Sequence, residues 1–195
     1  MEKIDQFQDT KQRILAVGES LIVGRGFSAL GLSEILTVAK VPKGSFYHYF
    51  QSKEGFGVAL LERYFCNYDV RMEALFSDAS LSARERILTY FRAWRDASDA
   101  HASHNICLAV KLSAEVSDLS EPMRQTLAQG MARITAQLAS VLTLAQMDGS
   151  VSVKMEATQL AEILYAMWVG ATLVSKVKRN SLALDLALQQ TEFML

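Results

Sequence analysis

Apolar side chains recur every three or four residues along most of this 195-residue chain, the spacing that predicts amphipathic α-helices. Residues 11–23 show this spacing, and Gly26 is well suited to end the helix as a C-cap. Residues 33–39 repeat the pattern over a shorter stretch, with Ser33 placed to cap its N-terminus. A tight turn at residues 40–42 follows. The start of the chain therefore predicts a long helix, a short helix and a turn.

The next segment, residues 43–50, is a short helix rich in aromatic and basic side chains. Phe46, Tyr49 and Phe50 fall on one helical face, which we expect to be buried. The opposite face carries groups that hydrogen-bond phosphates or base edges, or that let a backbone come close: Lys43, Gly44, Tyr47 and His48. A helix, a short helix, a tight turn and a second short helix form a helix-turn-helix, whose second helix enters the DNA major groove.

Residues 10–56 resemble the TetR family of bacterial transcriptional regulators. The positions that carry the resemblance are Gly26-Phe27, Val41, Lys43-Gly44, Tyr47, Tyr49-Phe50 and Ser52-Lys53-Glu54. Pro42 departs from the family pattern, which usually has Ser or Thr there and so offers one more hydroxyl to the DNA backbone. The resemblance implies operator contacts from a defined set of residues: Ser33, Lys43, Gly44, Ser45, Tyr47, His48 and Lys53.

The rest of the chain keeps the helical spacing and lacks the alternation typical of β-strands. We expect helices over residues 53–76, 82–100, 105–116, 120–147, 155–178 and 182–193. The predicted fold class is therefore all-α. A three-helix, helix-turn-helix domain at residues 1–53 would precede a helical effector and dimerisation domain at residues 54–195.

The last two predicted helices carry more apolar residues than one buried stripe requires. On the first of them these residues are Leu160, Ile163, Leu164, Met167, Trp168, Ala171 and Val174. A homodimer with a four-helix interface would cover the excess, whereas the alternative is a well-packed monomer core. The family resemblance favours the homodimer, which would hold two recognition helices one DNA turn apart, ~34–36 Å, on a pseudo-palindromic operator.

Charge and composition fit local DNA binding rather than general coating of nucleic acid. The formal net charge is −1, while residues 1–53 carry seven Lys or Arg and five Asp or Glu. This mildly basic segment on an acidic body suits a local DNA contact. The N-terminus is polar, and the apolar run at residues 160–177 is interrupted by Glu162, so we expect neither a signal peptide nor a membrane span. Two widely spaced cysteines fit a reducing cytoplasm.

Cys107 is the candidate for covalent sensing. It would lie in the first turn of its helix, where unpaired N–H groups favour a thiolate, with His104 and Lys111 on the same face. Lys176 is a further possible neighbour. Most free cysteines are instead buried and inert. Residues 107–116 also resemble a narrower branch of the family, which includes the repressor of N-ethylmaleimide reductase, and this resemblance favours a thiol that reacts with an electrophile or oxidant.

Aromatic side chains gather on the helices of the predicted effector domain: Tyr64, Tyr68, Phe91, Trp94, Tyr165 and Trp168. Taken one by one, these residues fit an ordinary core. The TetR family commonly keeps an internal ligand cavity, so the resemblance implies a pocket for a small hydrophobic inducer among them. Such a noncovalent inducer is the alternative to electrophile sensing.

Signatures of enzymes are missing from the sequence. There is no Gly-rich phosphate loop, no nucleophile elbow and no His-Glu-x-x-His zinc motif. Two histidines near Cys107 could ligate a metal, but surface histidines at a helix start are far commoner. We therefore predict no enzyme activity, no cofactor and no metal. The expected partners are an operator, an inducer and a second copy of the chain, with an architectural DNA binder or an enzyme as remote alternatives.

Overall fold

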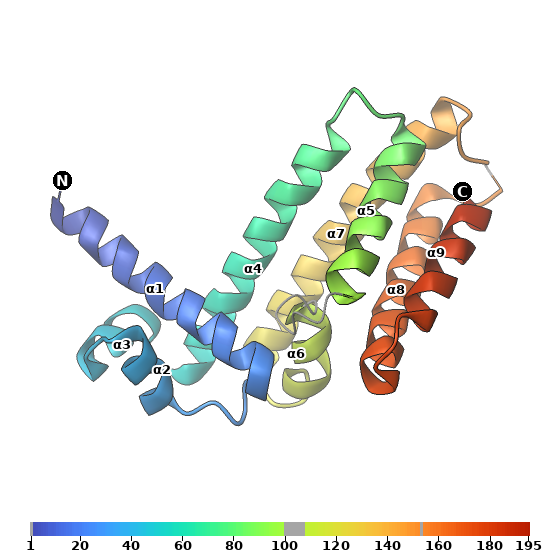
Figure 1. Ribbon diagram of the computed structural model, residues 1–195. Coiled ribbons are helices and arrows are strands. Elements are labelled where there is room, and N and C mark those ends of the chain that lie inside the picture. The colour runs from blue at the N-terminus through green and yellow to red at the C-terminus, as the bar shows by residue number, and fades with distance from the viewer. Residues whose placement is uncertain (1, 100–107, 153) are drawn as a thin grey trace. The chain divides into compact units, whose positions relative to one another are not determined.

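The computed structural model of the protein describes residues 2–99, 108–152 and 154–195. These residues form nine α-helices and no strand, which confirms the all-α fold class (Figure 1). The helices are α1 (Glu2–Arg25), α2 (Leu32–Ala39), α3 (Lys43–Phe50), α4 (Lys53–Phe76), α5 (Ala83–Asp99), α6 (Leu108–Val116), α7 (Glu121–Met147), α8 (Ala157–Lys178) and α9 (Leu182–Met194).

The helix boundaries follow the sequence pattern closely at α3 and α4, and less closely at α1 and α2. α1 is longer than expected because polar residues continue the helix beyond its apolar stripe. The prediction that Ser33 caps α2 is wrong, since Gly31 is the N-cap residue and no side chain caps the helix. Ser33 lies one residue inside α2, where its carbonyl oxygen accepts a hydrogen bond from Thr37 Oγ1 at 2.8 Å.

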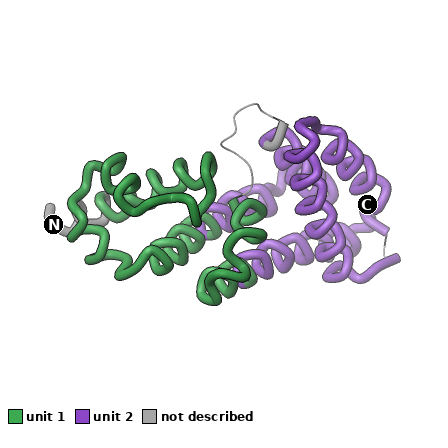
Figure 2. The backbone as a smooth tube through the Cα atoms, turned by 90° about the horizontal axis from the view of Figure 1, so that it is seen from below, with its two compact units in different colours: residues 1–65, 107–128 green, residues 66–106, 129–195 purple. Residues whose placement is uncertain are grey.

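The chain folds into two compact units, each made of two stretches that are separated in the sequence (Figure 2). Unit 1 contains residues 1–65 and 107–128, and unit 2 contains residues 66–106 and 129–195. The helix-turn-helix therefore shares a unit with α6 and the first part of α7. The predicted functional boundary at residue 53 stays a prediction.

Unit 1 is built around a cluster of phenylalanine rings. Phe46 and Phe50 of α3 and Phe56 of α4 have ring centroids 5.1 to 5.4 Å apart. All three side chains are buried, and burying such a ring stabilises a fold by about 1.5–3 kcal/mol. A Cβ at Gly18 of α1 would lie 2.2 Å from Phe56 Cζ, so only glycine lets α1 pack this closely. This cluster packs against the buried face of α3 and holds the helix in place.

Unit 2 contains α5, α8 and α9, and α9 packs against both α5 and α8. The inner face of α8 is buried, with Leu164 and Trp168 fully inaccessible. By length and composition α8 is apolar enough to cross a membrane, and 39% of its most apolar stretch is buried inside the protein. Core helices of soluble proteins can have the same length and composition.

Candidate DNA interface

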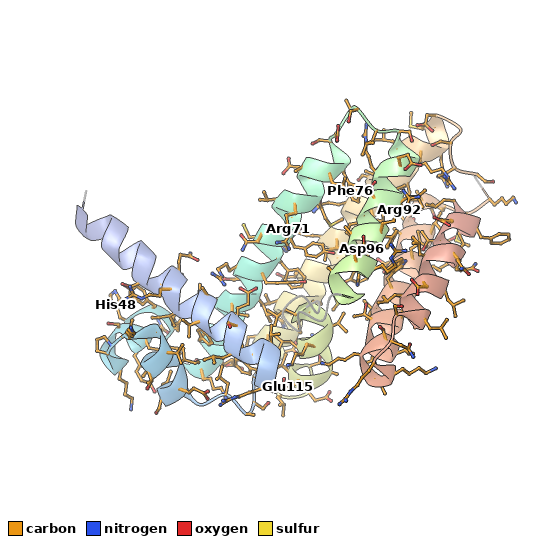
Figure 3. The ribbon with its side chains drawn as sticks, viewed as in Figure 1. His48, Arg71, Phe76, Arg92, Asp96 and Glu115 are labelled. Atoms are coloured by element: carbon orange, nitrogen blue, oxygen red, sulfur yellow. The ribbon has the colours of Figure 1, made fainter. Side chains whose placement is uncertain are left out.

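The outer face of α3 is open to solvent. The exposed residues among the predicted contacts on this face are Lys43, Gly44, Tyr47 and His48, and Ser45 is half-buried. Tyr47 is 45% exposed, and Lys43 Nζ lies 5.8 Å from the centroid of its ring. His48, which is labelled in Figure 3, contacts the ring of Tyr49 edge-on, with 5.0 Å between the ring centroids. The face combines a cation, a phenol and an imidazole on one short helix.

Gly44 has open space around it. A Cβ at this position would meet nothing within 4 Å, so internal packing does not require glycine there. A close approach by a molecule outside the chain would require it. Ser33, the predicted contact on α2, is also exposed.

Lys53 lies at the start of α4 and is bonded inside unit 1. Its Nζ donates a hydrogen bond to the carbonyl oxygen of Ser28 at 3.1 Å and lies 5.0 Å from the centroid of the Phe27 ring. A cation over an aromatic ring is attracted by the negative face of the ring. Lys53 therefore holds the segment between α1 and α2, in addition to the phosphate contact that the sequence predicts for it.

The segment between α1 and α2, residues 26–31, is also bonded by α6; we name it the α1–α2 connection. One carboxylate oxygen of Glu115 accepts the backbone N–H of Phe27 at 3.0 Å, and the other accepts that of Ser28 at 2.6 Å. Lys111 Nζ donates to the carbonyl oxygen of Val23, near the end of α1. Glu115 is labelled in Figure 3. Sequence reasoning missed Glu115 and named Lys111 only as a neighbour of the thiol.

The charge of Glu115 is stabilised by these contacts. Partial burial raises the pKa of its carboxyl, but the backbone N–H groups of Ser28 and Phe27, the Ser28 hydroxyl and the Lys111 cation outweigh burial. The net pKa is lower than the ordinary value of 4.5, so Glu115 is ionised at neutral pH.

The predicted effector residues are placed only in part. Cys107 and His104 lie outside the described residues. Lys111 belongs to unit 1, and Lys176 is exposed in the last turn of α8 in unit 2. Among the described residues, no group of three or more His, Cys, Asp or Glu side chains could hold a metal ion. Cys66 on α4 is exposed.

Five of the six predicted pocket residues form one aromatic cluster in unit 2: Tyr68, Phe91, Trp94, Tyr165 and Trp168. Tyr90, which the sequence analysis did not name, joins it through a 2.7 Å contact between its hydroxyl and that of Tyr68. The sixth, Tyr64, is buried in unit 1.

Both indole N–H groups in the cluster are satisfied. Trp94 donates to Thr172 Oγ1 and Trp168 donates to Thr191 Oγ1, each at 2.9 Å. Phe91 stacks on Trp168 at 4.9 Å. These contacts are typical of a packed core, and the lining of a ligand pocket stays a prediction.

Comparison with known proteins agrees with this architecture. Residues 14–60 match the family described as bacterial regulatory proteins, tetR family, and residues 83–191 match the tetracyclin repressor-like C-terminal domain. The chain is 44% identical over 180 residues to the HTH-type transcriptional repressor NemR of Escherichia coli K12, covering 92% of this chain and 90% of that protein. It is 31% identical to the HTH-type transcriptional repressor DhaR of Mycobacterium sp. GP1, covering 90% and 86%.

A solved structure supports the same conclusion at the level of the fold. The crystal structure of the reduced form of E. coli NemR superposes with a TM-score of 0.91 at 44% identity, covering 95% of this chain and 96% of that one. The matched families and relatives are regulators, and this chain is accordingly a regulatory protein and not an enzyme. It belongs to the TetR family of bacterial transcriptional regulators.

Proposed function

We propose that this TetR-family repressor binds a pseudo-palindromic DNA operator as a homodimer, and that a reactive electrophile or oxidant sensed at Cys107 releases it. The observation that carries the DNA-binding part is the outer face of α3, which is exposed while Phe46 and Phe50 anchor the helix from behind. Lys43 would contact phosphates, and Tyr47 and His48 would contact base edges. Such a repressor acts on DNA in the cytoplasm.

The homodimer is supported by an apolar stripe on α8 that its own unit leaves uncovered. The stripe consists of Ile163, Met167, Gly170, Val174 and Val177, spaced alternately four and three residues apart; we name it the outer stripe of α8. Ile163, Val174 and Val177 are exposed, and so are Leu182 and Leu186 on the neighbouring α9. Alternating steps of four and three are typical of helices that pack against a partner helix. Two copies of α8 and α9 would thus form the four-helix interface.

Sensing at Cys107 is supported by the chemistry of its neighbours in the sequence and by the NemR relative. One solved structure of NemR is of its reduced form, which fits a relative whose cysteines can be oxidised. In this chain His104 and Lys111 are the neighbours in the sequence that would favour the Cys107 thiolate. With a quinone, the thiolate sulfur would add to a ring carbon, and the displaced electron pair would move to the carbonyl oxygen, which takes up a proton.

Replacing Cys107 with serine should leave repression intact and abolish release by electrophiles. We would measure operator binding before and after treatment with a quinone, with wild type and Cys66→Ser as controls that should both be released. Wild-type protein and Cys66→Ser should lose operator affinity on treatment, because modification shifts the equilibrium between DNA-bound and free forms. Release of the Cys107→Ser protein would make the noncovalent inducer the leading explanation.

A second candidate for induction is a small hydrophobic ligand held noncovalently in unit 2. The paired hydroxyls of Tyr68 and Tyr90 favour it, because they place a polar group at the edge of an otherwise apolar aromatic cluster. Such a ligand would act without a thiol, so it would release the Cys107→Ser protein as readily as wild type.

Replacing Lys53 with alanine should affect both stability and DNA binding. Loss of the hydrogen bond to Ser28 should cost about 1 kcal/mol of stability. If Lys53 also contacts a phosphate, the slope of log affinity against log salt should fall by about one per protomer, equally for all DNA sequences. Lys43→Ala is the matched control and should change the slope with little loss of stability. An unchanged salt slope for Lys53→Ala would mean that Lys53 makes no phosphate contact and acts only in holding the α1–α2 connection.

A further inference from the structure

The α1–α2 connection and the last turn of α1 are held from α6 at three backbone groups. Glu115 accepts the N–H groups of Phe27 and Ser28, and Lys111 donates to the carbonyl oxygen of Val23. Lys111 and Glu115 are four residues apart, so both project from the same face of α6. The carbonyl of Val23 is among the last four of α1, which have no partner within the helix. α6 therefore supplies hydrogen-bond partners that neither α1 nor α2 provides for itself.

The same connection is also held from α4. Lys53 Nζ donates to the Ser28 carbonyl. A Cβ at Gly57 of α4 would lie 2.8 Å from Phe27 Cζ and 2.6 Å from Met123 Sδ, so the ring of Phe27 and the side chain of Met123 both pack closely against this glycine. Gly26 adopts a φ of +90°, and a Cβ there would lie 2.9 Å from Glu115 Oε2. The connection is thus fixed in one conformation from several directions.

The connection leads directly into α2, and α2 packs against α3. Leu30 and Ile35 are buried at this junction, and Arg25 at the end of α1 pairs with Glu34 in the first turn of α2 at 2.5 Å. A change in the connection therefore moves α2 and, with it, the outer face of α3. Glu115 and Lys111 lie on α6, outside that face, so any effect they have on DNA binding acts through the connection.

We propose that Glu115 and Lys111 are positioning residues for operator binding, which hold the α1–α2 connection, and through it α2 and α3, in the geometry that fits the major groove. This inference rests on the proposed function. Hydrogen bonds to an ionised carboxylate or ammonium are roughly twice as strong as neutral ones. Losing one lets the connection sample other conformations, and only a fraction of the protein then presents α3 correctly, which lowers apparent affinity by that fraction.

Replacing Glu115 with glutamine tests the proposal, because each backbone N–H is accepted by a different carboxylate oxygen and the amide puts an NH2 donor in the place of one of them. We expect about a tenfold loss of operator affinity at fixed salt, the effect of losing one hydrogen bond to a charged group. Affinity for non-operator DNA and the salt slope should stay unchanged, because no phosphate contact is lost. Circular dichroism and thermal unfolding should show that the protein is folded at the assay temperature, which separates positioning from loss of fold.

The matched control is Asp118→Asn, which removes the same charge from an exposed residue in the turn after α6. It should bind the operator like wild type. Lys111→Met should lower operator affinity in the same way as Glu115→Gln, and Lys111→Arg, which keeps a cation, should restore it. These measurements contain no electrophile, so they are independent of any role of Lys111 beside Cys107.

Folded Glu115→Gln protein that binds the operator as tightly as wild type, or more tightly, would overturn the proposal. If Glu115→Gln unfolds at the assay temperature, Lys111→Met and its arginine rescue decide the question by the same criterion. A wild-type protein that shows no preference for any operator would refute the proposed function, and this inference with it. Wild-type specificity that survives in both variants would refute the positioning role alone.

Discussion

Replacing Val174 with glutamate should convert the proposed homodimer into monomers and lower operator affinity by about 100- to 10,000-fold, the advantage that linking two binding sites normally confers. Val174 belongs to the outer stripe of α8 and is 40% exposed within its own protomer. Glutamate is a good helix former and would be solvated in the monomer. In the dimer it would be buried without a partner charge, which strongly disfavours association.

Sedimentation at micromolar concentration, together with operator binding, measures this effect. Val70→Glu is the matched control, because it makes the same substitution at a residue of α4 that is 62% exposed. It should remain a dimer and keep its operator affinity. A clean dimer of Val174→Glu would place the interface elsewhere on the molecule.

The choice of Val174 depends on the structure. The sequence pattern grouped Val174 with Leu164 and Ala171 as apolar residues of one helix, but both of these are buried within the protomer. A charge at Leu164 would disrupt the core of unit 2 and could not report on dimerisation. Only the exposed residues of α8 test the interface separately from the fold.

Replacing both Tyr47 and His48 with alanine should abolish recognition of the operator, with a loss of about 100-fold or more in affinity. Each good contact to a base edge contributes about 1–3 kcal/mol of discrimination, and a dimer would lose both side chains at each half-site. The protein should stay folded, because Phe46 and Phe50 anchor α3 from its opposite face. Binding to non-operator DNA should change little, because Lys43 keeps its charge.

Footprinting on the operator and on a scrambled sequence measures this difference, and Lys43→Ala is the complementary control. Lys43→Ala should weaken binding to both DNA molecules about equally and reduce the salt slope. If the Tyr47→Ala, His48→Ala protein protects the operator like wild type, the outer face of α3 is not the surface that reads base pairs.

The helices themselves were largely predictable because helix formation depends on residues that are close together in the sequence. α3 and α4 begin and end where apolar periodicity and Pro42 place them. Ser33 was wrongly predicted as a cap, because both Gly31 and Ser33 suit the start of a helix and the apolar Leu32 between them joins the helix. Periodicity also groups Phe91 and Trp168 as apolar residues, but it does not distinguish a packed core from the lining of a cavity.

The contacts behind the DNA interface were not predictable, because they join residues far apart in the sequence. Glu115 lies 88 residues from Phe27, and nothing in the sequence near either residue indicates their hydrogen bond. Lys111 was predicted from helical spacing to neighbour a thiol, a purely local argument, whereas its described partner, the carbonyl of Val23, is also 88 residues away. Such contacts depend on how α6 packs in unit 1.

Unit 1 has a consequence for how the protein is made. Its residues come from two stretches of the chain, 1–65 and 107–128, so the ribosome synthesises α1, α2 and α3 before the carboxylate that holds their connection exists. At ~5–20 residues per second, roughly 2.5–10 seconds separate the synthesis of residue 65 from that of Glu115. During that interval the nascent helix-turn-helix lacks the hydrogen bonds from Glu115 and Lys111. A polypeptide released early would carry every residue of the DNA-reading face without the support that α6 gives it.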